Sequence, residues 1–425
     1  MKYSKYNLLR IINGNYYIVN ILTSKYLKIT KSQYEKILNN ESTDEDLLNL
    51  LFKNGMLVNK DVDELDYLKK RYDEEQQRHD LLTITIAPTL RCNFNCTYCY
   101  ENKNGKIIDE ASQLKIINFI EKQLLSGYKK LNLIWFGGEP LMAFSIIKNM
   151  SKKIIEICDK YNVDYNAFMT TNGYLLSDDI ISDLKKLKIN QLYITLDGDS
   201  ITHNRRRCLL NGEPTFDTIV ENLYKLKKSK INTVIRMNID KTNEIAIEKL
   251  RDIVTNQLSL PMYLGLVRKY TDSCQDDDIY FDKKRYSEIQ DEFENRQALD
   301  KPTNNKLPRQ LPIYCRACKV GTFVIDPDLN IFKCENDIGR YDKRISTIDD
   351  YQYENEIGSA HNHSYYDWNP FEFDKCVKCD LLPICTGGCP YIGIKNNEPE
   401  CEIYKYNIDN YIKKYILQVE SNLQK

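Results

Sequence analysis

Three cysteines that lie within eight residues of one another are the side chains of this sequence best suited to bind metal. Cys92, Cys96 and Cys99 follow the apolar run 82–88, which has the composition of a buried strand. Three thiolates on one short loop can ligate three irons of a [4Fe–4S] cluster and leave the fourth iron open to another ligand. A structural zinc site is the alternative, but such sites usually take four Cys or His ligands, and His79 is the only histidine nearby.

Eight further cysteines gather between residues 315 and 401. Eight thiolates are the number that ligates two four-iron clusters fully. The segment 376–389 could instead form a four-cysteine zinc site by itself. The eight are Cys315, Cys318, Cys334, Cys376, Cys379, Cys385, Cys389 and Cys401.

Three cysteines stand alone. Cys158 occupies an apolar position of a helical pattern and is expected in the core. Cys208 follows a run of three arginines, and Cys274 lies in a charged stretch. We expect no catalytic role for any of the three.

Composition excludes several classes of protein. The 425 residues carry 60 basic and 61 acidic side chains, so a general attraction to nucleic acid or to anionic membranes is not expected. The N-terminus lacks the pattern of a signal peptide, and no stretch approaches the ~20 apolar residues of a membrane span. We therefore expect a cytoplasmic protein, in which the fourteen cysteines serve metal binding or chemistry and not disulfides.

The elements that position the first cysteine loop form a repeating strand–helix pattern. Helical stretches such as 110–127 and 177–188 separate the strands, which implies a parallel sheet because parallel neighbours need crossover connections. Six strands are too few for a complete eightfold barrel, so we expect an α/β fold with an open or partial (β/α)6 barrel. The expected strands are 82–88, 131–136, 165–171, 191–196, 232–240 and 262–267.

The flanking regions differ from this pattern. Residues 1–80 are expected to form a small module, with strands at 16–22 and 25–30, helices at 31–40 and 43–55, and a short strand at 56–59. Thr43 or Asp44 is the expected N-cap of the second helix. We expect the barrel over residues 81–312, ending in a charged helix and loop, and a cysteine-rich domain over 313–425.

The spacing Cys-x3-Cys-x2-Cys, with Tyr98 before the last cysteine, resembles the signature of the radical S-adenosylmethionine (SAM) superfamily. The resemblance implies that the open iron binds the amino and carboxylate groups of SAM. Electron transfer then yields a 5′-deoxyadenosyl radical, which abstracts a hydrogen atom from the substrate. It also implies that Tyr98 lies near the adenine.

Further motifs follow the expected strands in the order that this resemblance requires. Segment 136–140 resembles the superfamily's GGE motif, 170–173 its TNG segment, and 195–207 its S-x-D-G-x-x-x-x-H-D-x-x-R stretch, in which Asn204 replaces the usual Asp. Arg207 is our first choice among the three arginines for the SAM carboxylate. The implied SAM-binding residues are Tyr98, Gly137, Gly138, Glu139, Thr171, Asn172, Asp197 and Arg207.

The C-terminal cysteines resemble the SPASM domain, an extension of radical SAM enzymes that mature peptides and proteins. By this resemblance Cys315, Cys318, Cys334 and Cys389 hold one auxiliary cluster. Cys376, Cys379, Cys385 and Cys401 hold a second, outer one. Together with the first loop this implies three [4Fe–4S] clusters. One departure is Leu329, where a glycine is usual, and Asn330 is expected to supply the turn conformation instead.

The resemblance favours a maturase that forms a thioether or carbon–carbon cross-link in a ribosomally made precursor peptide. Residues 1–80 then resemble a winged-helix-like module that binds the leader by strand addition along Tyr16–Thr30. A structural cap on the barrel is the simpler alternative for this module. Ferredoxin or flavodoxin is the implied electron donor.

Two other functions stay open. An anaerobic sulfatase-maturating enzyme, which oxidises a Cys or Ser to formylglycine, resembles the chain from Thr83 to Cys401. A non-catalytic zinc protein that binds a partner is the alternative of another class. The sequence identifies no catalytic acid or base.

Overall fold

The computed structural model describes residues 1–39, 41, 44–101, 105–269, 277–300, 306–351 and 365–423. Two compact units divide the chain. The first unit contains residues 1–77, 282–318 and 367–425, and the second contains 78–281 and 319–366. This division by compactness does not test the expected boundaries at 80 and 312, which stay predictions.

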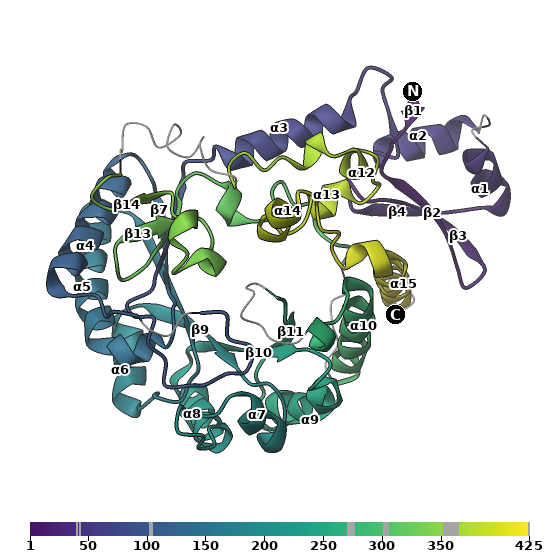
Figure 1. Cartoon of the computed structure of the whole chain (residues 1–425). Helices are drawn as coiled ribbons and strands as arrows, with labels where there is room; N and C mark the ends of the chain where they lie inside the picture. The colour runs from purple at the N-terminus through teal and green to yellow at the C-terminus, as the bar shows by residue number, and fades with distance from the viewer. Residues whose placement is uncertain are drawn as a thin grey trace. The chain divides into compact units, whose positions relative to one another are not determined.

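The second unit is built on a parallel sheet, as the strand–helix pattern predicts (Figure 1). Its six parallel strands are hydrogen-bonded in chain order, and all six expected strands are confirmed within a few residues. They are β6 (Leu81–Ile86), β7 (Lys130–Trp135), β8 (Asp164–Thr171), β9 (Ile189–Thr195), β10 (Asn232–Ile239) and β11 (Met262–Leu266).

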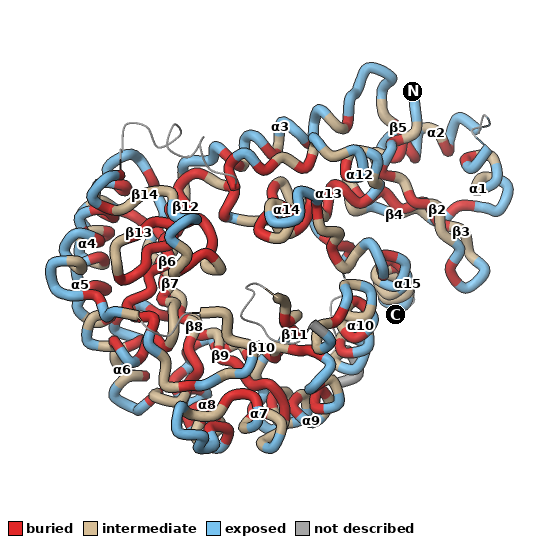
Figure 2. Tube along the Cα trace, viewed as in Figure 1, coloured by how far each residue is buried: buried red, intermediate tan, exposed pale blue. Residues whose placement is uncertain are grey.

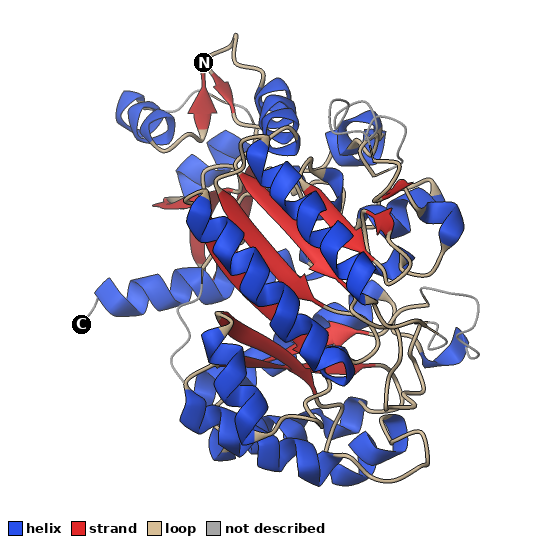
Figure 3. Cartoon of the chain, turned by 90° about the vertical axis from the view of Figure 1, so that its left-hand side faces the viewer, coloured by secondary structure: helices blue, strands red, loops and turns tan. Residues whose placement is uncertain are grey.

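Helices between these strands cover one face of the sheet (Figure 3). The strands carry the unit's core: Ile84, Leu133 and Trp135 are fully buried, and Figure 2 shows the strands mostly as buried chain. These helices are α4 (Glu110–Leu125), α5 (Phe144–Lys160), α6 (Asp178–Lys186), α7 (Ser200–Arg206), α8 (Phe216–Ser229) and α9 (Ile247–Arg251). α4 and α6 begin at the polar caps Asp109 and Ser177, whose side chains accept hydrogen bonds from backbone amides.

A hairpin from the cysteine-rich region extends this sheet beside β6. β12 (Thr322–Ile325) pairs in parallel with β6, β13 (Asn330–Phe332) returns antiparallel to β12, and β14 (Ser346–Thr347) follows. The expected role of Asn330 in the turn is wrong. Leu329 itself adopts the left-handed conformation, with φ 65°, and the Asn330 side chain donates to the Asp326 carboxylate at 2.9 and 3.2 Å. This buried hydrogen bond ties Asn330 into the strand, so the strained conformation falls to its neighbour.

The first unit begins with an antiparallel meander. The strands expected at 16–22 and 25–30 are present, but β1 and β2 were not predicted. Asp44 caps the second helix through a 2.8 Å bond from the Leu47 amide, whereas Thr43 lies outside the described residues. The elements are β1 (Lys2–Tyr3), β2 (Asn7–Ile12), β3 (Asn15–Asn20), β4 (Lys25–Ile29), α1 (Lys31–Leu38), α2 (Glu45–Lys53), β5 (Leu57–Val58) and α3 (Glu64–Gln76).

Further helices of the first unit come from the later parts of the chain. The two long ones are α10 (Lys283–Asp300), at the expected charged helix, and α15 (Tyr404–Leu423), at the expected C-terminal helix. Short helices α12 (Asp374–Val377), α13 (Leu382–Cys385) and α14 (Pro390–Asn396) carry or adjoin cysteines. Within the described residues, no helix combines the length and apolarity that crossing a bilayer requires.

Candidate SAM and cluster sites

The first three cysteines lie together on the loop that follows β6. Burial, together with the charges of Glu139, Cys96 and Cys99, raises the pKa of the Cys92 thiol to about 12. Each thiol is therefore close enough to disfavour the ionisation of its neighbour. A bound cationic metal would reverse this effect by holding the ligands as thiolates.

The glycine pair after β7 packs against the chain just before Cys92. A methyl group at Gly138 would come within 2.3 Å of the Arg91 carbonyl oxygen, and one at Gly137 within 2.5 Å of that of Thr89. Gly137 also has φ 108°, which favours glycine. The Gly138 amide donates to Thr89 O at 3.2 Å. The two glycines thus hold the base of the cysteine loop by direct backbone contact.

Glu139 ties the ends of β7 and β8 together. The carboxylate is fully buried and accepts hydrogen bonds from the Thr171 hydroxyl and the Asn172 amide, both at 2.7 Å, and from the Leu141 amide at 2.9 Å. Burial raises its pKa, although these bonds oppose the shift. These three bonds leave the Glu139 carboxylate with further acceptor capacity, so it can also accept a hydrogen bond from a SAM amino group. That expected contact stays a prediction.

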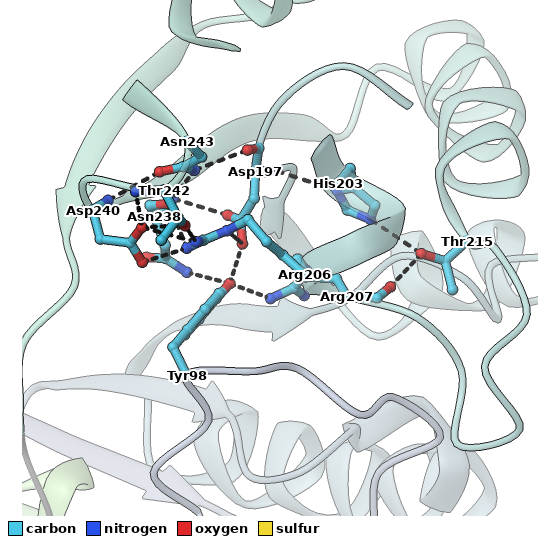
Figure 4. A network of polar contacts seen from close by, with 10 residues as sticks. All are labelled: Tyr98, Asp197, His203, Arg206, Arg207, Thr215, Asn238, Asp240, Thr242 and Asn243. Carbon is cyan, nitrogen blue, oxygen red and sulfur yellow. Dashed lines mark hydrogen bonds and ion pairs between the residues drawn. The ribbon is translucent and has the colours of Figure 1, made fainter. Parts of the chain in front are cut away.

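Tyr98 is held at the centre of a buried polar network (Figure 4). Its hydroxyl donates to Asp197 at 2.5 Å and accepts from Arg207 at 2.7 Å and from Asn238 at 3.0 Å. Asp197 follows β9 and is fully buried, and it also accepts from the Asn238 amide. Burial is the main cause that raises the pKa of Tyr98. The loop after β6 and the ends of β9 and β10 therefore meet at one hydroxyl group.

The three consecutive arginines have three different environments. Arg205 is exposed. Arg206 is buried in ion pairs with Asp240 at 2.9 Å and Asp197 at 3.6 Å. Burial alone would lower the pKa of Arg207, but Cys96, Tyr98 and Asp197 outweigh burial and raise it. Arg207 is the one of the three that lines the cavity described below, which fits its expected role.

Asn204, the departure from the superfamily pattern, has a structural role that explains its tolerance. Its side-chain oxygen accepts hydrogen bonds at 2.9 Å from the amides of Thr215 and Phe216, where α8 begins. Asn and Asp both supply such an acceptor, so replacement of Asp keeps the cap. Neighbouring His203 is buried, and burial lowers its pKa. It bonds to the Asp197 amide and the Thr215 hydroxyl.

A cavity opens above these residues in the second unit, with about 1000 Å³ of space including the solvent at its mouth. Six of the eight expected SAM-binding residues line it, and the buried Glu139 and Asp197 support it from behind. Sequence reasoning missed Phe94, Arg236, Asn238, Leu266 and Val267. The full lining is Cys92, Phe94, Cys96, Tyr98, Cys99, Tyr100, Glu101, Phe136, Gly137, Gly138, Thr170, Thr171, Asn172, Thr195, Arg207, Arg236, Asn238, Leu266, Val267 and Arg268.

The residues present fit an iron–sulfur cluster with SAM. Three thiols face one side of the cavity, and three cysteines match a cluster that leaves one iron open. The Nε atom of Arg207 is buried and has no hydrogen-bond partner among the described residues, which leaves a donor for a ligand carboxylate. The apolar side chains of Leu266 and Val267 offer a surface for an aromatic ring.

Four C-terminal cysteines lie together in the first unit. Burial raises the pKa of the Cys376 thiol to about 12, and Cys385, Cys379 and Cys401 add to this shift. Burial likewise raises the pKa of Cys385 to about 11, with Cys401 among the contributing charges. These four are the expected ligands of the outer cluster, and their proximity fits that expectation.

The other auxiliary cluster stays a prediction. Cys315, Cys318 and Cys389 belong to the first unit and Cys334 to the second. In the described part of the chain, no three His, Cys, Asp or Glu side chains converge to hold one metal ion. A four-iron cluster makes a different demand, because each thiolate binds a separate iron.

Of the solitary cysteines, Cys158 has the expected place in the core, whereas the absence of a catalytic role for Cys208 stays a prediction. Cys158 is fully buried, with a pKa that burial raises to about 12. Cys208 is partly buried, and its carbonyl accepts from the Asn95 amide at 2.8 Å, which braces the cysteine loop. Cys274 lies outside the described residues.

Comparison with known proteins identifies the superfamily of the central region. The family model of the radical SAM superfamily matches residues 86–254. The chain therefore carries a radical SAM domain and is a radical SAM enzyme, as the cysteine loop predicted. This finding removes support from the alternative of a non-catalytic zinc protein.

Two relatives and one solved structure are similar over most of the chain. The radical SAM cyclopropyl synthase TigE of Paramaledivibacter caminithermalis is 23% identical, over 96% of this chain and 90% of that protein. The cysteine-type anaerobic sulfatase-maturating enzyme of Clostridium novyi is 22% identical, over 78% of this chain and 96% of its own. The structure of SuiB from Streptococcus suis bound to precursor peptide SuiA matches with TM-score 0.56 and 15% identity, over 94% of this chain and 98% of that one.

Proposed function

We propose that this enzyme is a peptide maturase, which modifies a ribosomally made precursor by radical chemistry and forms a thioether or carbon–carbon cross-link. The observation that carries the proposal is the three-cysteine loop at a cavity, held by the Tyr98–Asp197–Arg207 network. When bound, the cluster and SAM supply an electron and a 5′-deoxyadenosyl radical, which abstracts a hydrogen atom from the peptide.

The chain's own residues prepare the cavity for these groups. Cys92, Cys96 and Cys99 would hold three irons. Arg207 places a positive charge beside Cys96, and a guanidinium group is suited to pair with a carboxylate. Tyr98 is fixed by hydrogen bonds from both sides, so its ring presents a rigid surface for an adenine.

The N-terminal module supports a peptide substrate with a leader. The similarities to TigE and SuiB extend over 96% and 94% of the chain, and that to the sulfatase-maturating enzyme over 78%. The share of this chain that the sulfatase-maturating enzyme does not match is comparable in length to this module. Within the expected edge of Tyr16–Thr30, β3 is central and β4 (Lys25–Ile29) is an edge of the three-stranded sheet, so strand addition would occur at β4.

Several finer features belong to the same proposal. The parallel strands would form a partial barrel, and residues 1–80 a winged-helix-like module. Cys315, Cys318, Cys334 and Cys389 would hold one auxiliary cluster, and Cys376, Cys379, Cys385 and Cys401 the other. A ferredoxin or flavodoxin would deliver electrons in the cytoplasm.

A sulfatase-maturating activity is the second candidate. The similarity to the Clostridium novyi enzyme favours it, since that match covers 96% of the relative. The two candidates share the cavity chemistry and differ in the substrate, so product analysis separates them.

The test is anaerobic purification with iron and sulfide counting, followed by reduction in the presence of SAM. We expect 5′-deoxyadenosine to form. With a precursor peptide encoded beside the gene, we expect a mass loss of about two daltons per cross-link, because two hydrogens leave the substrate. Formylglycine in a sulfatase peptide, with no change in the precursor, would favour the second candidate. Protein that binds iron but never releases 5′-deoxyadenosine would overturn both.

A further inference from the structure

We propose that Arg236 forms a carboxylate-binding subsite in the cavity, which recognises an acidic side chain or the free C-terminus of the substrate. The inference rests on the proposed peptide substrate and names one chemical feature of that peptide. Arg236 belongs to none of the motifs that predicted the SAM site.

The register of the sheet directs Arg236 into the cavity. On β10, Ile235 and Met237 are fully buried, whereas Arg236 and Asn238 alternate with them and line the cavity. Arg236 lies opposite Thr195 of β9, which also lines the cavity, and opposite Tyr263 of β11. Its position is therefore fixed by three adjacent strands.

The absence of a side chain at Gly265 makes room for the guanidinium group. A methyl group there would come within 2.5 Å of the Nε atom of Arg236 and within 3.0 Å of a terminal nitrogen. The guanidinium also lies close enough to the Tyr263 side chain to oppose the rise in the pKa of Tyr263 that burial causes. Nε itself is buried and has no hydrogen-bond partner among the described residues. A buried donor without an acceptor is destabilising, and a ligand that supplied an acceptor would remove this cost.

The chemistry of the cavity favours an anionic ligand. The charged side chains that line it among the described residues are Arg207, Arg236, Arg268 and Glu101, apart from the cysteines. The carboxylate of Asp197 lies close by but is engaged by Tyr98 and Arg206 and is fully buried. An arginine fork matches a carboxylate with two parallel hydrogen bonds, and carboxylates are the anions that an unmodified peptide offers.

Arg236 and Arg207 serve different carboxylates in this proposal. Arg207 contacts the cysteine loop through the Tyr98 hydroxyl and lies 5.6 Å from the Phe94 ring centroid. Arg236 contacts residues of β11 instead. A SAM molecule at the cysteine loop would engage Arg207, and Arg236 would stay available for the substrate.

The experiment compares Arg236→Gln with wild-type holoenzyme, reconstituted with its clusters and loaded with SAM. The probes are N-acetyl-Gly-Asp-Gly-amide, N-acetyl-Gly-Asn-Gly-amide and N-acetyl-Gly-Gly-Gly with a free carboxylate, titrated by ligand-observed NMR. In the wild type we expect an acidic probe to bind at least about tenfold more tightly than the Asn probe, since a site built to pair a charge rejects its neutral analogue. In Arg236→Gln this ratio should fall below about threefold, because the charge-assisted hydrogen bonds are gone.

Arg205→Gln is the matched control, since it removes the same charge from an exposed position, and it should keep the wild-type ratio. Preference for the Asp probe identifies a side-chain carboxylate, and preference for the free-carboxylate probe identifies the C-terminus. Equal binding of acidic and neutral probes by the wild type overturns the proposal. A tenfold or greater loss of SAM affinity in Arg236→Gln would also overturn it, because Arg236 would then serve the cofactor.

Two further measurements separate this subsite from a structural role and from the proposed function. Because Nε is unsatisfied without a ligand, Arg236→Gln should not lower the Tm of the peptide-free protein, whereas loss of a structural arginine would. If the variant does not fold, Gly265→Ala tests the same site, because its methyl group displaces the guanidinium and should reduce acid selectivity. Wild-type release of 5′-deoxyadenosine is assayed separately, so acid-selective binding without that product would sink the proposed function alone.

Discussion

The two groups of cysteines differ in what surrounds them. Cys92, Cys96 and Cys99 face an open cavity, and buried polar side chains hold their loop. Cys376, Cys379, Cys385 and Cys401 lie in the first unit, where Cys376 and Cys379 pack with an apolar core that includes Leu382 and Ile384. The first group has three thiols and lines a cavity. The second group has four thiols and packs with apolar side chains. The comparison teaches that the two groups differ both in the number of thiols and in the polarity of their surroundings, as we expect if only the first is open to another ligand.

The largest expected effect tests this difference directly. Cys99→Ala should lower 5′-deoxyadenosine formation more than about 100-fold. Residues that only hydrogen-bond to a metal ligand can already cost about 100-fold when they are replaced, and Cys99 is itself an expected ligand. Cys376→Ala should remove about four irons per chain and yet leave SAM cleavage within about threefold, because its cluster does not bind SAM. Iron counting and product quantification check both variants. Equal loss of SAM cleavage in the two variants would erase the distinction.

The buried polar side chains that hold the loop of the first group should contribute strongly to the free energy of unfolding. Asp197→Ala removes the acceptor of Tyr98 and one carboxylate near the buried Arg206. We expect a loss of about 3–5 kcal/mol in the free energy of unfolding, as for a broken buried pair. Asp349→Ala is the control, because its ion pair with Lys115 is exposed, and such pairs contribute at most about 1 kcal/mol. Urea unfolding of the metal-free protein measures both, and similar losses would contradict the network's role.

The metal-free cysteine loop should make stability depend on pH. The pKa of Cys92 is raised from 9.0 to about 12 in the folded chain. The unfolded chain therefore loses this proton first, so the contribution of Cys92 is fully present below pH 9 and is lost as pH rises toward about 12. Subtracting the profile of Cys92→Ser isolates this thiol from the other groups that titrate there. A wild-type profile parallel to that of the variant would refute the assignment. Cluster-loaded protein should lack the effect, because its ligand is already a thiolate.

The smallest effect concerns the hairpin that follows Cys318. Leu329→Gly should stabilise the second unit by about 1 kcal/mol, because a leucine at φ 65° is strained where glycine is not. Thermal unfolding checks this change. Asn330→Gly is the comparison, and it should destabilise, because the bonds to Asp326 are lost. A destabilised Leu329→Gly would mean that the leucine side chain contributes more than the backbone strain costs.

Much of the fold was predictable because its signals are local. Apolar runs located the six strands. Side chains such as Asp44 marked the start of a helix, because Asp44 accepts a hydrogen bond from a residue only three positions further along the chain. The cysteine loop was predictable for the same reason, since its spacing encodes its geometry. β1 and β2 were missed because one has two residues and the other, NLLRII, lacks a clear alternation.

Features that depend on distant parts of the chain were not predictable. Arg236 and Asn238 reach the cavity because the register between β9, β10 and β11 turns them there. Leu329 takes a conformation that its residue type disfavours, because the Asn330 side chain is held by Asp326. In both cases contacts between distant residues override the local conformational preference. No short segment of the sequence contains those contacts.

The close fit of the glycine pair to residues 89–91 has a consequence for sequence change at this site. Because the backbones touch directly, any side chain larger than hydrogen at Gly137 or Gly138 would push the cysteine loop away from the end of β7. A substitution at either glycine would therefore disturb the ligand geometry without altering a single ligand.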